Sequence, residues 1–251
     1  MEEKEPWRID KESVHFKVLK GWLSSTFKLW LFRNSQKYNL SEDELLIKIA
    51  ETIRKIIYRV FQLLNEKTGK EANPPFVVIT DNPYGDALTL DFAVETRLGS
   101  DFLPDLALAR KQLGLLGAMQ VALSGIEQEV AASSGGLCIC GSAVKFGIAF
   151  YDQFVRIMLE NFDNIDYRKN FLRVVIEESF HCFCNQTDEF NGKEMSAELD
   201  SLRRMKNADL QKKYQMDAEI EKKYGVKQKV DELLQILEQE LDDLLSLLPS
   251  K

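Results

Sequence analysis

The residues best suited to chemistry lie in one apolar stretch, Val174 to His181, which holds one of the two histidines of the chain. Glu177 and His181 are four residues apart, so on a helix their side chains leave one face, with Glu178 one step around. Because apolar residues flank these acids, no wide solvent-facing side remains, and buried acids need partners or a metal ion. The spacing predicts a helical metal site with an adjacent general base.

Two further acids, Glu194 and Glu198, follow this stretch after a polar turn. In the strand-helix-turn-helix order expected here, the region resembles the core of a zincin-type metallopeptidase of the gluzincin arrangement. In that family an H-E-x-x-H helix and a downstream glutamate bind zinc. The resemblance covers about residues 137–205. It implies a metal-dependent, peptidase-like hydrolase in which residues 137–151 supply the edge strand that pairs with extended substrates.

The resemblance also assigns roles to individual residues. His181 matches the second histidine, and Glu178 matches the general base, which takes a proton from metal-bound water. Glu194 and Glu198 match the third ligand and the carboxylate that orients it, in either order. Glu177 stands where the first histidine belongs, so the motif is E-E-x-x-H. A carboxylate in that place makes a harder, more anionic site, which suits Mn, Fe(II) or Mg better than the His-rich zinc (Zn) site of the family does.

The lost histidine leaves another class of function open. A zincin-like frame without its usual ligands could be a catalytically inactive binding or scaffold protein. Amphipathic helices at both ends of the chain would suit protein partners. The acidic pair could also be only a solvated or hydrogen-bonded part of its helix. A metal-dependent hydrolase and a pseudoenzyme therefore stand as alternatives.

The four cysteines allow rival sites. Cys138 and Cys140 form one C-x-C pair, and Cys182 and Cys184 form a second. Zinc ribbons usually use C-x2-C spacing, which disfavours a four-cysteine zinc site. Cys184 lies three residues after His181, so a Glu-His-Cys metal site or a Cys-His nucleophile pair is an alternative. The expected role for all four is that of small buried apolar side chains.

Helical periodicity dominates residues 1–70. Apolar residues recur at helical spacing over residues 10–35, which predicts one helix. A second helix is predicted from the capping box at Ser41–Glu44 to about Lys67. Together they predict an N-terminal helical hairpin, with His15 on a helix surface.

Residues 71–205 alternate between strand and helix patterns and are predicted to form the zincin-like α+β core with a small β-sheet. Strands are predicted over Phe76 to Thr80, over 87–95 and, as a strand or strand pair, over 137–151. Helices are predicted over 104–131, over 152–162, over 167–185 with Asp166 as its cap, and from about Glu194.

The remaining residues, 206–251, are predicted to form a C-terminal helical extension. From Val230 to Leu248 apolar residues recur at i+3 and i+4, and acids occupy most of the positions between them. A stripe of this size needs a partner surface, and we expect it to dock on the N-terminal hairpin of the same chain. The fold class expected for the whole chain is α+β and predominantly helical.

Composition narrows the class of partner. The formal charge of -7 argues against nucleic acid, although residues 1–70 carry 14 Lys and Arg against 10 Asp and Glu. No apolar run reaches the roughly 18–20 residues of a membrane span. The acidic start, Met1 to Pro6, is unlike a signal peptide. We therefore expect a cytoplasmic protein with reduced cysteines, no membrane partner, and a peptide or protein as substrate or partner.

Overall fold

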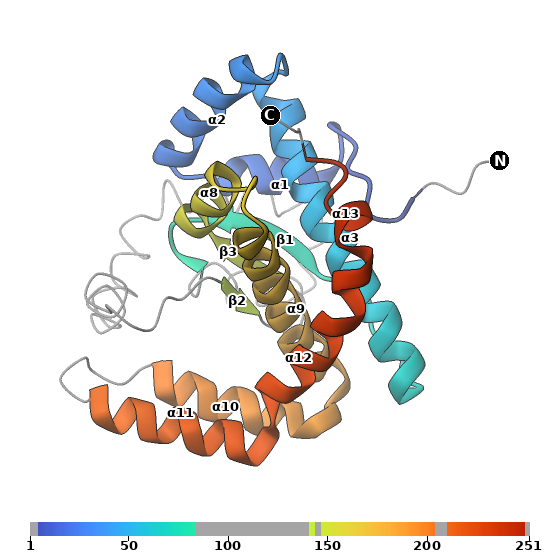
Figure 1. Cartoon of the computed structure of the whole chain (residues 1–251), viewed down its shortest axis with the longest axis vertical. Coiled ribbons are helices and arrows are strands. Elements are labelled where there is room, and N and C mark those ends of the chain that lie inside the picture. The colour runs from blue at the N-terminus through green and yellow to red at the C-terminus, as the bar shows by residue number, and fades with distance from the viewer. Residues whose placement is uncertain (1–4, 84–140, 144–146, 204–209, 249–251) are drawn as a thin grey trace.

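The computed structural model describes residues 5–83, 141–143, 147–203 and 210–248 (Figure 1). Most of these residues are helical, and short strands form one small sheet. The predicted class, α+β and predominantly helical, is therefore confirmed. The strand predicted over 87–95, the helix predicted over 104–131, and Cys138 and Cys140 lie outside the described residues.

The N-terminal region contains three helices rather than the predicted two: α1 (Val14–Trp22), α2 (Ser25–Lys37) and α3 (Glu42–Thr68). The prediction of one helix over residues 10–35 is wrong because the backbone is extended at Leu23 and Ser24. The Ser24 hydroxyl accepts a hydrogen bond from the Phe27 N–H at 3.0 Å, which starts α2. It also donates to the carboxylate of Asp152, so the break ties α2 to a distant part of the chain.

The helix α3 follows the prediction closely. Ser41 Oγ accepts from the Glu44 N–H at 3.2 Å, and the Glu44 carboxylate accepts from the Ser41 N–H at 2.8 Å, which confirms the capping box. The helix ends at Gly69, whose φ of 67° is in the left-handed region that favours glycine. Its inner side buries a continuous apolar stripe, formed by Leu45, Leu46, Ile49, Ile53, Ile56, Ile57, Val60, Phe61 and Leu64.

The sheet has the order β1-β3-β2, with β1 at Phe76–Thr80, β2 at Gly141–Ala143 and β3 at Gly147–Tyr151. The strand predicted at Phe76 to Thr80 and, in the part that is described, the strand pair predicted over 137–151 are confirmed. β1 and β3 are parallel, with Val77 opposite Ile148, whereas β2 and β3 are antiparallel. A parallel pair requires a crossover connection between its strands.

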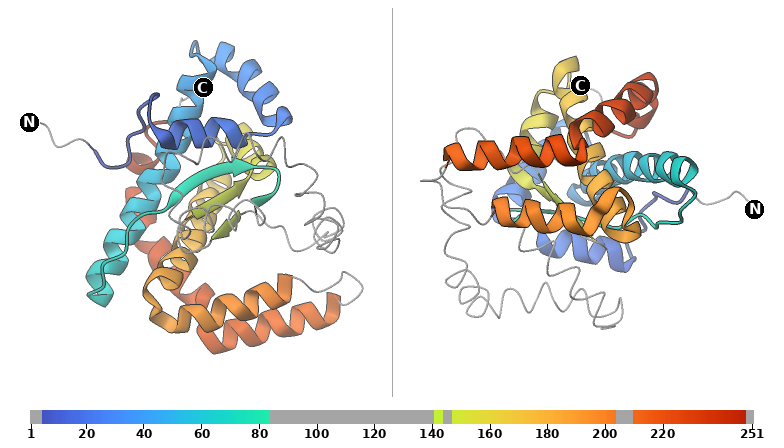
Figure 2. Two further views of the ribbon diagram at one scale, coloured as in Figure 1. Left: turned by 180° about the vertical axis from the view of Figure 1, so that it is seen from behind. Right: turned by 90° about the horizontal axis from the view of Figure 1, so that it is seen from below.

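The helix α1 packs against β1 (Figure 2). His15 on this helix accepts a hydrogen bond through Nε2 from the Val77 N–H at 3.4 Å, and its ring lies 5.2 Å from the ring of Phe76. Burial, and secondarily the charge of Arg54, lowers the pKa of His15 to about 3. The predicted surface position is therefore only partly correct, because His15 is half-buried and its ring accepts a hydrogen bond from the backbone of β1.

The chain then forms α8 (Asp152–Glu160) and α9 (Ile165–Thr187). The cap of α9 is Asn164, which accepts from the Asp166 N–H at 2.9 Å, so the prediction of Asp166 as the cap is wrong by two residues. α9 packs against α3 and the sheet and is buried on most of its sides. A short 3-10 turn, η2 (Glu189–Asn191), leads to α10 (Gly192–Arg203) and α11 (Leu210–Tyr224), which lie side by side (Figures 1 and 2).

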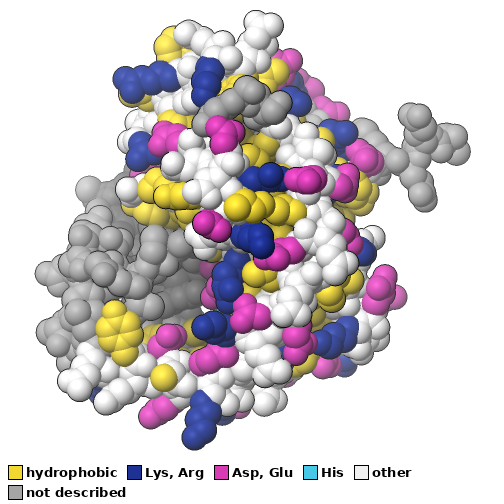
Figure 3. All heavy atoms as spheres, viewed as in Figure 1, with side chains coloured by type: hydrophobic (Ala, Val, Ile, Leu, Met, Phe, Trp, Pro, Cys, Tyr) yellow, Lys and Arg dark blue, Asp and Glu magenta, His cyan; other side chains and the backbone are white. Residues whose placement is uncertain are grey.

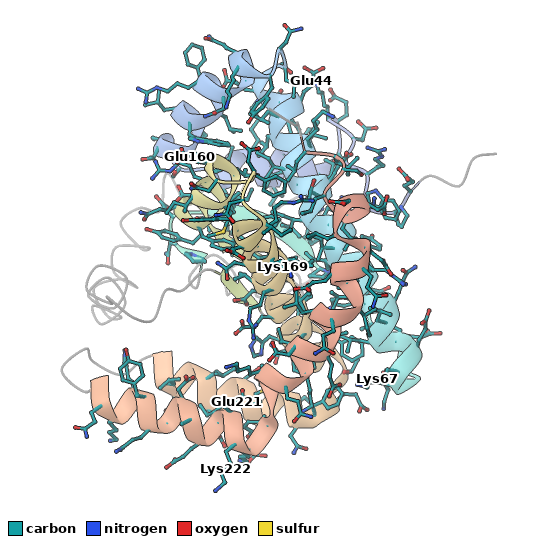
Figure 4. All side chains as sticks on the ribbon, viewed as in Figure 1. Glu44, Lys67, Glu160, Lys169, Glu221 and Lys222 are labelled. Atoms are coloured by element: carbon teal, nitrogen blue, oxygen red, sulfur yellow. The ribbon has the colours of Figure 1, made fainter. Side chains whose placement is uncertain are left out.

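The C-terminal segment comprises α12 (Val226–Leu237), η4 (Glu238–Glu240) and α13 (Leu241–Leu244). The expectation that it docks on its own chain is confirmed, but α12 lies chiefly on α9, and it is α13 that reaches α3. Oppositely charged side chains alternate where it crosses these helices (Figure 3). Lys169 of α9, for example, reaches Glu238 at 3.2 Å (Figure 4).

Candidate functional site

Three of the residues predicted to carry chemistry, Glu177, Glu178 and His181, lie on α9. Glu178 and His181 are 7% and 8% exposed, and Glu177 is half-buried. Glu177 and His181 line one cavity of about 460 Å³, as their spacing predicts. Glu178, one step around the helix, does not line this cavity. α9 therefore presents an acid and an imidazole to a space large enough for a ligand group.

The cavity lies among α9, α10, α11 and α12, and its apolar part is formed by Leu199, Ile220, Val226 and Val230. Charged groups complete the lining: Arg173, Glu177, Asp217, Glu221 and Lys227. The two cations differ in their surroundings. Arg173 is paired with Asp231 at 2.7 Å, whereas the Lys227 side chain is exposed.

Two carboxylates of α11 shape the electrostatics of this cavity. Glu221 accepts from the backbone N–H of Lys227 at 2.9 and 3.0 Å and so satisfies a free donor at the start of α12 (Figure 4). Asp217 is exposed, but partial desolvation, and secondly the charge of Glu221, raises its pKa. The Glu221 charge is the smaller of these two effects, but it indicates that two carboxylates lie close together on this side of the cavity.

The downstream acids of the resemblance lie in a different setting. Glu194 and Glu198, both on α10, accept from the same ammonium group, Lys223 Nζ, at 2.7 and 2.6 Å. The hydroxyl of Tyr224 donates to Glu198 at 3.1 Å. The hydrogen bond from Lys223 lowers the pKa of Glu198, and the two carboxylates raise that of Lys223. These acids therefore join α10 to α11, and neither lines the cavity beside His181.

The turn between α9 and α10 sets the position of these acids. Asp188 ends α9 in the left-handed conformation, with φ of 60°. A Cβ at Gly192 would lie 2.2 Å from the backbone oxygen of Cys184. The start of α10 can therefore approach α9 this closely only because residue 192 is a glycine. The Ser196 hydroxyl also donates to the side chain of Asn185. α10 is thus held closely against the end of α9.

The predicted metal ligands are divided between two places. Glu177 and His181 line the cavity, while Glu194 and Glu198 are bound by Lys223. In the described parts of the chain, no three His, Cys, Asp or Glu side chains are grouped so that they could hold a metal ion. As arranged, the donors do not fit the three-ligand set of the resemblance. Metal binding stays a prediction.

Cys182 and Cys184 are both buried thiols. Burial raises the pKa of Cys184 to about 12, so its thiol stays protonated at neutral pH. A protonated thiol is a poor nucleophile and a poor metal ligand, which argues against both rival roles of Cys184. For this pair the expected role as small buried side chains is confirmed.

Sequence reasoning missed several residues of the cavity. Arg173 could have been found, because Arg173, Glu177 and His181 follow one another at intervals of four on one helix. Asp217, Glu221 and the lysine that binds the α10 acids had no such signal. They come from α11 and meet α9 and α10 only in the folded chain.

No family model, curated protein or solved structure matches this chain. The zincin resemblance therefore stays a prediction carried by residues 137–205. In the described residues no helix has the length and apolar character needed to cross a bilayer.

Proposed function

We propose that this chain is a non-catalytic binding protein on a zincin-like frame, and that its cavity beside His181 takes a basic side chain of a protein or peptide partner. The observation that carries this proposal is that two of the acids expected to bind a metal ion are bound to a lysine instead. Lys223 binds both acids that would complete a metal site. Other acids, Glu177, Asp217 and Glu221, surround the cavity.

The chemistry of the cavity suits a Lys or Arg side chain. Such side chains lay an apolar stem along hydrophobic surface and direct a charged head to polar groups. Here Ile220, Val226 and Val230 offer the apolar surface, and the carboxylates of α9 and α11 offer acceptors for a cation. A ligand cation would also offset the charge of Glu221, which together with the larger effect of desolvation raises the pKa of Asp217.

Binding of short peptides to the full chain, measured by calorimetry, tests this proposal. Arg- or Lys-containing peptides should bind at least about tenfold more tightly than matched Ala peptides, since charged hydrogen bonds contribute about 1.5–3 kcal/mol. Asp217→Asn should weaken the basic peptide and leave the Ala peptide unchanged. The matched control is Glu219→Gln, an exposed acid on α11 outside the cavity. Equal binding of basic and Ala peptides would contradict the proposal.

Metal-dependent hydrolysis of a peptide or amide is the second candidate function. One observation favours it. Glu177 and His181 line the same cavity, and Glu178, which lies outside that cavity, is buried beside them on α9. Metal analysis of the full chain purified without chelator separates the candidates. Stoichiometric Zn, Mn or Fe that is lost in His181→Ala and in Glu194→Gln would favour the hydrolase and contradict the binding protein. Metal far below one equivalent supports the binding protein.

A further inference from the structure

The outward face of α2 carries two large apolar side chains. Leu29 and Phe32 are each 50% exposed and are three residues apart, so they lie together on one helix face. The opposite face is packed in the core through Phe27, Trp30 and Leu31. Elsewhere in the described chain the exposed large apolar residues are spread over separate elements: Ile165, Tyr214 and Ile236.

Cations stand on both sides of this apolar pair. With 100° of rotation per residue, Arg33 and Lys37 lie to one side of the pair and Lys28 lies to the other. Arg33 and Lys37 are exposed, and α2 contains no Asp or Glu. This is unusual in a chain with a net charge of -7. Lys and Arg side chains gather over α2 at the upper left of the molecule (Figure 3).

The spacing of these residues indicates the kind of surface that would cover them. A helix that binds in a protein groove presents apolar anchors at positions i, i+3, i+4 and i+7. Here Leu29 and Phe32 fill the first two positions, but the next two are Arg33 and Gln36. An apolar centre flanked by cations is instead the distribution of helices that lie in the interface of an anionic membrane.

We propose that α2 docks the protein reversibly on an anionic lipid surface. Leu29 and Phe32 enter the boundary between headgroups and acyl chains, and the flanking cations contact acidic headgroups. α2 is well placed for this role, because it lies at the periphery of the molecule and its inner face contacts α3 and α8 (Figure 1). The expectation of no membrane partner rested on the lack of a spanning segment, which an interfacial helix does not need.

Co-sedimentation of the full chain with lipid vesicles tests the proposal. Binding should be stronger to phosphatidylcholine vesicles that contain phosphatidylserine than to phosphatidylcholine alone, and it should weaken with added salt. Replacing Arg33 and Lys37 by Gln should lower the partition coefficient by about fivefold per charge. The double variant Leu29→Ser/Phe32→Ser should lower it by about tenfold or more. These side chains are half exposed, so thermal unfolding of both variants should stay close to that of the wild type.

Matched controls come from other elements. Ile236→Ser removes a comparably exposed apolar side chain from α12, and Lys222→Gln removes an exposed cation from α11. Neither control should change vesicle binding. Equal binding to both vesicle types, or equal losses in the controls, would overturn the proposal. A wild-type dimer by sedimentation velocity that Leu29→Ser/Phe32→Ser dissociates, with no vesicle binding, would also overturn it, because the face would then join two copies of the chain.

Discussion

Ion pairs join the C-terminal segment to α3 and α9, and others join α10 to α11, but these two regions differ in what lies beneath the ion pairs. In the C-terminal segment, acids of α12, η4 and α13 pair with α3 and α9, as Glu240 does with Arg59 at 2.7 Å. Beneath them lies a stripe of buried residues: Val230, Leu233, Leu237, Leu241, Leu244 and Leu245. In the α10–α11 pair, Lys223 holds Glu194 and Glu198 at the surface.

These two regions show that an ion pair can matter for two different reasons: it can stabilise the fold, or it can occupy side chains that a ligand would otherwise use. Exposed ion pairs contribute little to folding, whereas each large apolar side chain that is fully buried contributes about 1.5–3 kcal/mol. The C-terminal segment is therefore held chiefly by its apolar stripe, and its ion pairs add little to that. At Lys223 the pairing matters for another reason, because it occupies two carboxylates that a metal site would need.

The largest effect should follow from removing the C-terminal segment by truncation after Gly225. Burial of its stripe contributes on the order of 10 kcal/mol before chain entropy is subtracted. Its loss would also expose the faces of α3 and α9 on which it lies. The truncated protein should be insoluble or unfolded by circular dichroism. A truncated protein that stays monomeric with an unchanged melting temperature would show that the segment is not part of the core.

The turn at Gly192 should be the next most sensitive place. Gly192→Ala puts a Cβ about 2 Å from the backbone of Cys184, so α10 must shift, and we expect a loss of about 3 kcal/mol. Gly69→Ala is the matched control, since that Cβ would meet nothing within 4 Å and would cost only about 1 kcal/mol for its left-handed backbone. Urea unfolding measures both variants. Equal losses would mean that the close approach of α9 and α10 is not needed.

A half-buried histidine, His15, makes the stability of the fold depend on pH. The folded pKa of His15 is about 3, below the ordinary value near 6.5, so the unfolded chain takes up a proton first as pH falls. Its contribution to stability should therefore be lost progressively from about pH 6.5 down to pH 3, by at most about 5 kcal/mol in total. Denaturant unfolding at pH 7 and pH 4 should show a smaller acid loss in His15→Gln than in the wild type. Parallel curves for the two proteins would contradict the desolvation of the His15 ring.

The smallest effect on stability should come from Lys223→Gln, because this ion pair is exposed. The pKa of Glu198 is lowered by Lys223, so the associated stabilisation exists above the unfolded carboxyl pKa and is lost as pH falls through the folded one. In the variant this pKa should rise toward its ordinary value in an NMR titration, while the melting temperature hardly changes. Lys227→Gln is the control cation. An unchanged Glu198 pKa would show that Lys223 does not stabilise the Glu198 carboxylate.

The elements were predictable where local sequence was sufficient. The capping box at Ser41, the β-branched strand from Phe76 and the stripe of the C-terminal helices each carry their own signal. The one-face relation of Glu177 and His181 also follows from helix geometry alone. The break at Ser24 was not predictable in this way, because apolar periodicity continues across it while a side chain hydrogen bond and a distant carboxylate decide it.

What the sequence alone determined is therefore the class of fold, most helices and the side chains that α9 can present. Only the tertiary structure decided the use of those side chains. It brings Lys223 to Glu194 and Glu198, and it places His15 on a strand edge that is 62 residues away. The physical reason is that periodicity and capping act over a few residues, whereas ion pairing and desolvation depend on which helices come to lie together.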